Sequence, residues 1–393
     1  MRLSRALLLV SGLLTALPAF AVYAPVPVQE ASAKDLSVTI RGGLSYDTNL
    51  FGSPTNTVET AVWELAPRLN YMNSVTPQTF LAAGYGLTLN QFQDRPGDKF
   101  LDSHDAQFRV AHAFTKTTNI DVNNLFILSR NPESLLAGVP LNPDQSFLRN
   151  QLDGRFATVL GPKVGAALKA RTVYYDYRNA ILARAIDRTE TLLGATADYA
   201  ILPELKGVGE YRHQEVYYRK LGETKNKSSD YLMAGLDYDV ARKFSVSSRF
   251  GAEWRERASE ASTTAPYVEL SGKYDYAETS YLASGYAFTF DETSDTARFT
   301  DSKVHRFFVN VEHRLTALIV LSGSFSYENA VLQGRRIVAD VDEESVRTGV
   351  ALSYLPTKNW MLSASYDFDQ IFSEEAARDM KRQRTGLSAT YSF

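Results

Sequence analysis

The chain of 393 residues contains no cysteine, which excludes a disulfide scaffold, a thiolate zinc site, an iron–sulfur cluster, a cysteine nucleophile and a lipid-modified N-terminal cysteine. It also lacks an excess of charge of either sign, because 42 basic and 45 acidic residues leave a net charge of −3. That balance provides no basic surface for binding nucleic acid, so we do not expect nucleic acid as a partner. Aromatic residues are abundant at 12%, and a chain with so much apolar surface to bury is not expected to be disordered.

The N-terminus carries the pattern of an export signal. Two arginines near the start precede an apolar run over residues 6–17, which is followed by the small–x–small sequence Ala19-Phe20-Ala21 that signal peptidase reads. No later run approaches the ~18 apolar residues that a spanning helix needs. We therefore divide the chain into a signal peptide at 1–21, a short periplasmic segment at 22–34 and a transmembrane β-barrel at 35–393.

From Leu36 onward, apolar and polar residues alternate with period two, which is typical of antiparallel strands that have one apolar face. Leu36, Val38 and Ile40 share one face of the first such stretch, and the same division recurs in residues 244–255 and 360–369. A soluble sandwich would show this alternation too. The spacing of the connections between strands therefore has to distinguish a soluble sandwich from a membrane barrel.

Connections alternate between short and long, and the short ones recur about 40 residues apart, as in a repeated hairpin unit. The tight turns are predicted at 74–78, 115–118, 161–163, 202–204, 241–243, 277–279, 316–317 and 356–359. The long polar loops are predicted at 48–59, 93–101, 131–144, 179–185, 219–227, 257–262, 292–301, 333–342 and 373–379. Eight short turns and nine long loops predict eighteen strands, an even number with both chain termini on the short-turn side, as in bacterial outer-membrane barrels.

The last strand supports this interpretation, because Thr385, Leu387, Ala389, Tyr391 and Phe393 share one face. A terminal aromatic residue on an amphipathic strand resembles the insertion signal that the barrel assembly machinery recognises, so this machinery is an expected partner. Closure leaves no unpaired sheet edge in lipid. The expected fold class is therefore all-β, an antiparallel transmembrane barrel of about 18 strands in the cell outer membrane, in contact with its lipid.

The outward face of such a barrel is expected to be aliphatic at mid-strand and aromatic near both lipid interfaces. The aromatic residues that fit these girdles are Trp63, Tyr71, Tyr85, Tyr174, Tyr199, Tyr238, Trp254, Tyr274, Tyr327, Tyr354, Trp360 and Tyr366.

The inward face is where function is expected, because barrels of roughly 16 to 18 strands leave an aqueous channel. A solvated lumen tolerates charges, whereas an arginine that faces lipid at mid-depth costs about 2–4 kcal/mol. The residues that we expect to line the lumen are Arg41, Arg68, Arg109, Arg155, Arg171, Arg212, Arg249, Arg306, Arg347, Arg382, Arg384, Glu253, Asp367 and Asp369.

Two roles are open for these charged residues. Arg41 is expected beside Arg382 and Arg384, where the first and last strands meet, and such a row of guanidinium groups can bind carboxylates or phosphates bidentately. Acidic residues on the same face equally suit cross-strand ion pairs that stiffen the wall.

One loop stands apart, at residues 131–144, because it is the longest and contains Leu135, Leu136, Val139 and Leu141. It joins the fifth and sixth predicted strands, the position at which trimeric porins fold a constriction loop into the pore. Its apolar residues suit packing inside the barrel, capping of the rim or contact with a partner.

The candidate catalytic residues are the five histidines, His104, His112, His213, His305 and His313. Asp105 follows His104, which leaves an Asp–His pair open, but such neighbours arise by chance in a sequence rich in Asp and Ser. No metal-ligand spacing and no phosphate-binding loop occurs. We expect no enzyme, no cofactor and no metal site.

The start of the predicted barrel reads Tyr46-Asp47-Thr48-Asn49-Leu50-Phe51. Tyr46, Asp47, Asn49 and Phe51 resemble the opening of a family of outer-membrane β-barrel porins that includes barrels encoded with exopolysaccharide biosynthesis and export genes. The resemblance implies passage of a polysaccharide or another polar solute, with polysaccharide and periplasmic export components as partners. On physical grounds, Asp47 and Asn49 are expected to end the first strand by bonding their own backbone in a turn.

These observations predict an outer-membrane channel, and secretion of exopolysaccharide through a polar lumen is the first hypothesis. The alternative is a general or substrate-specific diffusion porin for small polar solutes. A third possibility is a structural or adhesive barrel whose own loops block the lumen. No residue distinguishes a channel for polymers from one for monomers.

Overall fold

The computed structural model describes residues 35–130, 146–240, 243–258, 260–293, 298–335, 337–375 and 378–393. Its strands are β1 (Leu36–Asp47), β2 (Thr60–Thr76), β3 (Thr79–Phe92), β4 (Phe100–Ala113), β5 (Thr118–Ser129), β6 (Phe147–Gly161), β7 (Val164–Tyr177), β8 (Arg188–Leu202), β9 (Leu205–Tyr218), β10 (Lys227–Val240), β11 (Phe244–Arg257), β12 (Thr263–Ala277), β13 (Ser280–Asp291), β14 (Phe299–Arg314), β15 (Ile319–Gly334), β16 (Val341–Tyr354), β17 (Trp360–Ser373) and β18 (Met380–Ser392).

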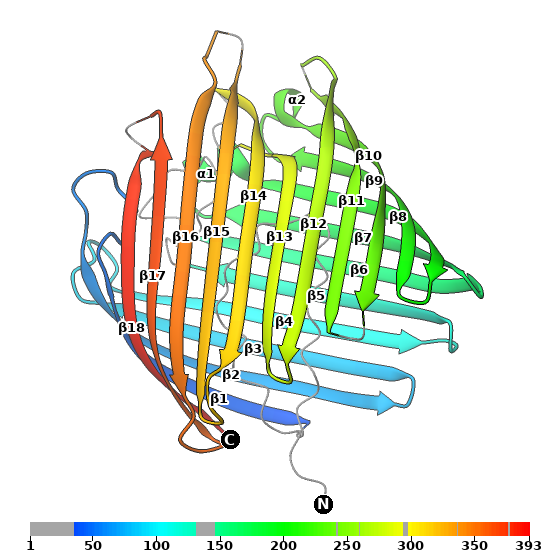
Figure 1. The fold of residues 1–393 in the computed structure, drawn as a ribbon. Coiled ribbons are helices and arrows are strands. Elements are labelled where there is room, and N and C mark those ends of the chain that lie inside the picture. Colours follow the sequence, from blue (N-terminus) through cyan, green and yellow to red (C-terminus); the bar gives the residue numbers. More distant parts are fainter. Residues whose placement is uncertain are drawn as a thin grey trace, which may run out of the picture.

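These eighteen strands, counted over the described residues, form one closed antiparallel barrel (Figure 1). Each strand pairs with its neighbours in the sequence, and β1 also pairs with β18, from Thr39 opposite Ser392 to Asp47 opposite Arg384. Closure satisfies the backbone of both end strands, which a sheet in lipid requires. The predicted fold class and strand number are confirmed.

Short and long connections alternate around the barrel as predicted, so that the described long loops lie at one end and the described short turns at the other (Figure 1). In outer-membrane barrels the short turns face the periplasm. We therefore call the end with the short turns and the C-terminus the periplasmic end, and the end with the long loops the extracellular end.

Two of the long loops contain short helices, where the sequence analysis expected only loops. These are α1 (Ala180–Ile186) and α2 (Gly222–Lys225). The Asn179 side chain caps α1 by accepting hydrogen bonds from the backbone N–H groups of Ile181 and Leu182. No helix of the described residues is long and apolar enough to cross a membrane.

The outward face of the barrel is an exposed apolar surface. Leu168, Leu232 and Leu387 are 61%, 58% and 64% exposed, although their aliphatic side chains would be buried in a soluble core. Aromatic side chains accompany them toward the strand ends, and at the periplasmic end Tyr391 packs between Trp360 and Phe393, with ring centroids 5.0 and 4.7 Å apart. A closed barrel with such a surface is a transmembrane protein of the outer membrane.

Apolar side chains also cluster on the inner side, in small groups that lie mostly toward the extracellular end. Phe299, Leu332 and Val341 form one such group, and Phe147, Tyr177 and Ile186 belong to another that packs beneath α1. These clusters hold the long loops against the strands rather than forming a central core.

Candidate functional site on the inward face of the barrel

The inward face is the face opposite the exposed apolar side chains, because strand residues point alternately to the two sides of the wall. The pairing registers place on it all the predicted lumen residues, namely Arg41, Arg68, Arg109, Arg155, Arg171, Arg212, Arg249, Arg306, Arg347, Arg382, Arg384, Glu253, Asp367 and Asp369. Their contacts determine which of them are accessible to a solute.

Most of these arginines form ion pairs with carboxylates of the same face, and every pair except Arg212–Glu210, which lies within β9, joins two strands. The pairs are Arg41–Glu64, Arg68–Asp105, Arg109–Asp121, Arg171–Asp153, Arg212–Glu210, Arg249–Asp237, Arg306–Asp291, Arg306–Glu328, Arg382–Asp47 and Arg384–Asp369. Arg347 lies opposite Asp369 in the pairing of β16 with β17, and Asp367 lies opposite Arg384 in that of β17 with β18.

The expected row of Arg41 with Arg382 and Arg384 is wrong. Arg41 lies opposite Thr390, while Arg384 lies opposite Asp47 at the other end of β1. The stagger between the first and last strands of a barrel is set by its overall shear. That stagger separates the arginines and brings each of them to a carboxylate instead.

Arg155 differs from the other predicted arginines. Its side chain is exposed, and it lies between Asp121 on β5 and Lys169 on β7, both of which have other partners. Within the described part of the chain, no carboxylate lies at ion-pair distance from Arg155. It is an accessible cation on the wall.

The middle of the wall holds a network centred on Glu210, whose side chain is fully buried. Its carboxylate lies 3.0 Å from Lys169 Nζ, 2.7 Å from Arg212 Nε and 3.4 Å from Arg249 Nε. Arg212 also donates to the hydroxyl of Tyr267 at 3.1 Å. Three cations around one carboxylate stiffen the strands that carry them, because a satisfied buried network has a single arrangement.

A second network lies at the extracellular end and was not predicted. The Glu292 carboxylate lies 2.9 Å from Lys227 Nζ and 3.0 Å from Arg257 Nη2, and it accepts a hydrogen bond from the Tyr218 hydroxyl at 2.7 Å. Burial acts to raise the pKa of the Glu292 carboxyl, but Lys227 and Arg257 outweigh it and hold that pKa below its ordinary value. Asp301 continues the network, 2.8 Å from both Arg257 and Arg255.

Lys227, Arg257 and Asp301 were missed because the predicted loops at 219–227, 257–262 and 292–301 took in the ends of the neighbouring strands. A signal was nevertheless present, since Glu253, Arg255 and Arg257 keep the period-two spacing up to the last residue of β11. Loop boundaries drawn from polarity alone end a strand too early when its inward face is itself charged.

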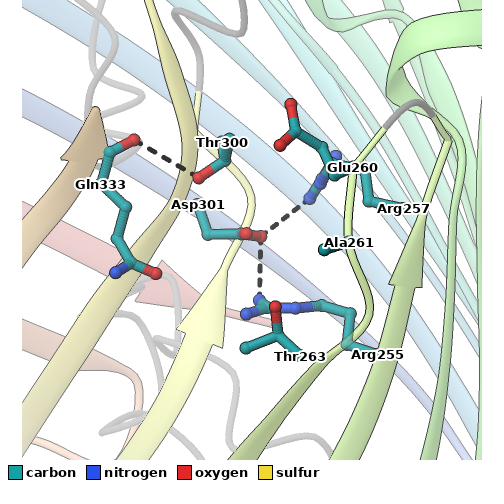
Figure 2. A pocket seen from close by; sticks show the side chains of 8 residues that line it. All are labelled: Arg255, Arg257, Glu260, Ala261, Thr263, Thr300, Asp301 and Gln333. Carbon is teal, nitrogen blue, oxygen red and sulfur yellow. Dashed lines mark hydrogen bonds and ion pairs between the residues drawn. The ribbon is translucent and has the colours of Figure 1, made fainter. Parts of the chain in front are cut away.

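A small recess opens beside this network (Figure 2). It has a volume of about 70 Å³ and lies between the end of β11, the loop that follows it, and the starts of β12 and β14. Arg255, Arg257 and Asp301 form one side of it, and the Thr263 and Thr300 side chains lie around it.

The histidines lie on the outward face, so the open Asp–His hypothesis for His104 and Asp105 is wrong. Asp105 points inward to Arg68, whereas His104 points outward and hydrogen-bonds Tyr85 at 2.7 Å and Asp102 at 3.0 Å. Consecutive strand residues face opposite sides of the wall. Among the described residues, no group of His, Asp and Glu side chains is arranged to hold a metal ion.

The apolar residues proposed for a constriction loop, Leu135, Leu136, Val139 and Leu141, lie outside the described residues. The flanking strands β5 and β6 pair along their length, from Thr118 opposite Thr158 to Ser129 opposite Phe147. The function of this loop stays a prediction.

No family model matches the sequence, and no curated protein is detectably similar to it. Solved structures with a similar fold include Pseudomonas aeruginosa OccK2 (OpdF) in complex with glucuronate, at 8% identity and a TM-score of 0.49, covering 91% of this chain and 96% of that one. A BenF-like porin from Pseudomonas fluorescens Pf-5 has 10% identity, a TM-score of 0.48 and coverage of 92% and 99%. Acinetobacter baumannii OccAB4 has 13% identity, a TM-score of 0.46 and coverage of 92% and 99%. Similarities this weak carry no inference about function.

Proposed function

We propose that the protein is a passive channel that lets small polar solutes diffuse through the outer membrane. The observation that carries the proposal is the charge of the inward face, which continues from Arg41 halfway along β1 to Arg257 at the extracellular end of β11. A barrel of this strand number is wide enough for an aqueous lumen. Charged residues of both signs stay hydrated there and suit polar solutes.

Export of exopolysaccharide, the first hypothesis from the sequence, has weaker support. It rests on the resemblance of Tyr46, Asp47, Asn49 and Phe51, and these residues have architectural contacts. Asp47 pairs with Arg382, Asn49 donates to the backbone oxygen of Lys381 at 3.0 Å, and Phe51 is buried in an apolar cluster. A motif whose residues join β1 to β18 is compatible with the passage of any solute.

The aromatic side chains of the inward face also favour small solutes. Tyr218, Tyr231 and Tyr267 point inward, yet each is 1% exposed. A long sugar chain that slides along the wall would require exposed contact surfaces, and these rings are covered by neighbouring side chains instead.

Liposome swelling tests the proposal. Liposomes containing the protein are loaded with an impermeant polymer and diluted into isotonic solutions of small sugars, amino acids or a long dextran. We expect swelling in the small solutes at rates well above those of protein-free liposomes, and none in dextran. Absence of swelling in every small solute would overturn the proposal, and entry of dextran would favour polysaccharide passage instead.

A further inference from the structure

The recess at the extracellular end has the features of a binding site for an anionic group. Arg255 lines it with a side chain that is 3% exposed and stacked on the ring of Phe290, 4.3 Å from its centroid. Stacking fixes the plane of the guanidinium group. Its five N–H donors are therefore held in one orientation beside the recess.

Among the described residues Arg255 has one ion pair, with Asp301, and its Nη1 makes no hydrogen bond. Arg255 Nη1 lies 2.8 Å from Asp301 Oδ1, but that contact lacks hydrogen-bond geometry, and the atom is buried without a hydrogen-bond partner. Arg257 Nε, also buried, has none either. Buried guanidinium donors that make no hydrogen bond are costly, so the unused hydrogen-bonding capacity of these two atoms favours an acceptor in the recess.

The charged side chains beside the recess form one chain of contacts. Lys227, Glu292, Arg257, Asp301 and Arg255 form a chain of contacts in which three cations alternate with two carboxylates. Two more carboxylates lie nearby: Glu260, 3.5 Å from Arg335 Nη1, and Glu253, which accepts a hydrogen bond from Ser229 at 2.7 Å. Arg255 stands at the end of the chain and shares the carboxylate of Asp301 with Arg257.

We propose that this recess binds a small oxyanion, a carboxylate or phosphate group of a solute, through Arg255 and the Thr263 hydroxyl. A recess of about 70 Å³ holds several water molecules and therefore accommodates such a group. The recess lies at the extracellular end of the inward face. The inference that the bound group belongs to a solute about to enter the lumen rests on the proposed function, whereas binding itself does not.

The test is calorimetric titration of the full-length protein in detergent with inorganic phosphate, acetate and, as an uncharged control, glycerol. We expect saturable binding of at least one anion and none of glycerol. Arg255→Gln is expected to weaken binding about tenfold or more, because it removes charge-assisted hydrogen bonds. The relative affinities of phosphate and acetate identify which group is preferred.

A second variant tests the site while keeping Arg255, whose replacement also removes buried contacts of the fold. Thr263→Asp places a carboxylate beside Arg255 from an exposed position, so it should also abolish binding, whereas Thr264→Asp on the outward face should not. Absence of saturable binding by both anions, or unchanged binding in Thr263→Asp, would overturn the site. Binding without solute flux in liposomes would support the site while removing the proposed channel.

Discussion

Arg382 on the last strand donates hydrogen bonds from Nε to both carboxylate oxygens of Asp47 on the first strand, at 3.1 and 3.0 Å, and both side chains are almost fully buried. Asp47 simultaneously accepts from the backbone N–H of Asn49 at 3.0 Å, as the sequence predicted, and Asn49 in turn reaches the backbone of β18. One short segment thus ends β1 and fastens the barrel at its closing seam.

Arg382→Met is expected to destabilise the barrel by about 3–5 kcal/mol, because it leaves the carboxylate of Asp47 buried without its partner. Urea unfolding followed by the heat-modifiable shift on gels measures this loss. Arg41→Met is the matched control, since the Arg41–Glu64 pair is 40% and 25% exposed and should contribute about 0–1 kcal/mol. Equal losses in the two variants would contradict a structural function for the seam.

Gly251→Ala is expected to cost roughly 1–3 kcal/mol or more, because an added Cβ would lie 2.0 Å from the carbonyl oxygen of Leu232 on β10. Gly154→Ala is the control, because nothing lies within 4 Å of a Cβ there, and alanine should stabilise the strand by about 0.5–1 kcal/mol. The same urea transitions report both changes. Opposite signs are expected, and a Gly251→Ala barrel as stable as the parent would refute the close approach.

Arg155→Gln is expected to lower the chloride-over-potassium permeability ratio by up to about sixteenfold, because a unit charge ~5 Å from an ion in water contributes roughly 0.8 kcal/mol, with opposite sign for chloride and potassium. Reversal potentials in a potassium chloride gradient measure this ratio. Lys381→Gln removes the same charge from the outward face of β18 and should leave the ratio unchanged. An unaltered ratio in Arg155→Gln would mean that ions do not pass near this side chain.

Acidification is expected to weaken the extracellular network through Glu292. Its pKa is held below the ordinary value of about 4.3 by Lys227 and Arg257, against the opposing effect of burial. A carboxyl with a lowered folded pKa stabilises the fold above its unfolded pKa, and this stabilisation is lost as the pH falls below about 4 toward the folded value.

Urea midpoints between pH 6 and pH 3 check this dependence. The parent protein should lose more stability over that range than Glu292→Gln, whose side chain does not titrate. A parallel decline of the two proteins would exclude Glu292 as a contributor.

The architecture was readable from the sequence because a barrel repeats one local pattern. Alternation assigned Arg212 and Glu253 to the inward face, and loop polarity set the number of strands. Neither the alternation nor the loop polarity revealed which charged side chains form ion pairs with one another. Arg257 meets Asp301, 44 residues away, only because the registers of three strand pairs align them, and Arg41 failed to meet Arg382 for the same reason. Local periodicity carries no information on shear.

Planar bilayer recording decides whether the interior of the barrel conducts. Addition of the purified full-length protein should produce discrete, stable current steps with a linear dependence on voltage, since an aqueous lumen lined by charged residues passes ions in both directions. Insertion confirmed by protease protection of the barrel, with no current steps at any voltage, would contradict an open channel.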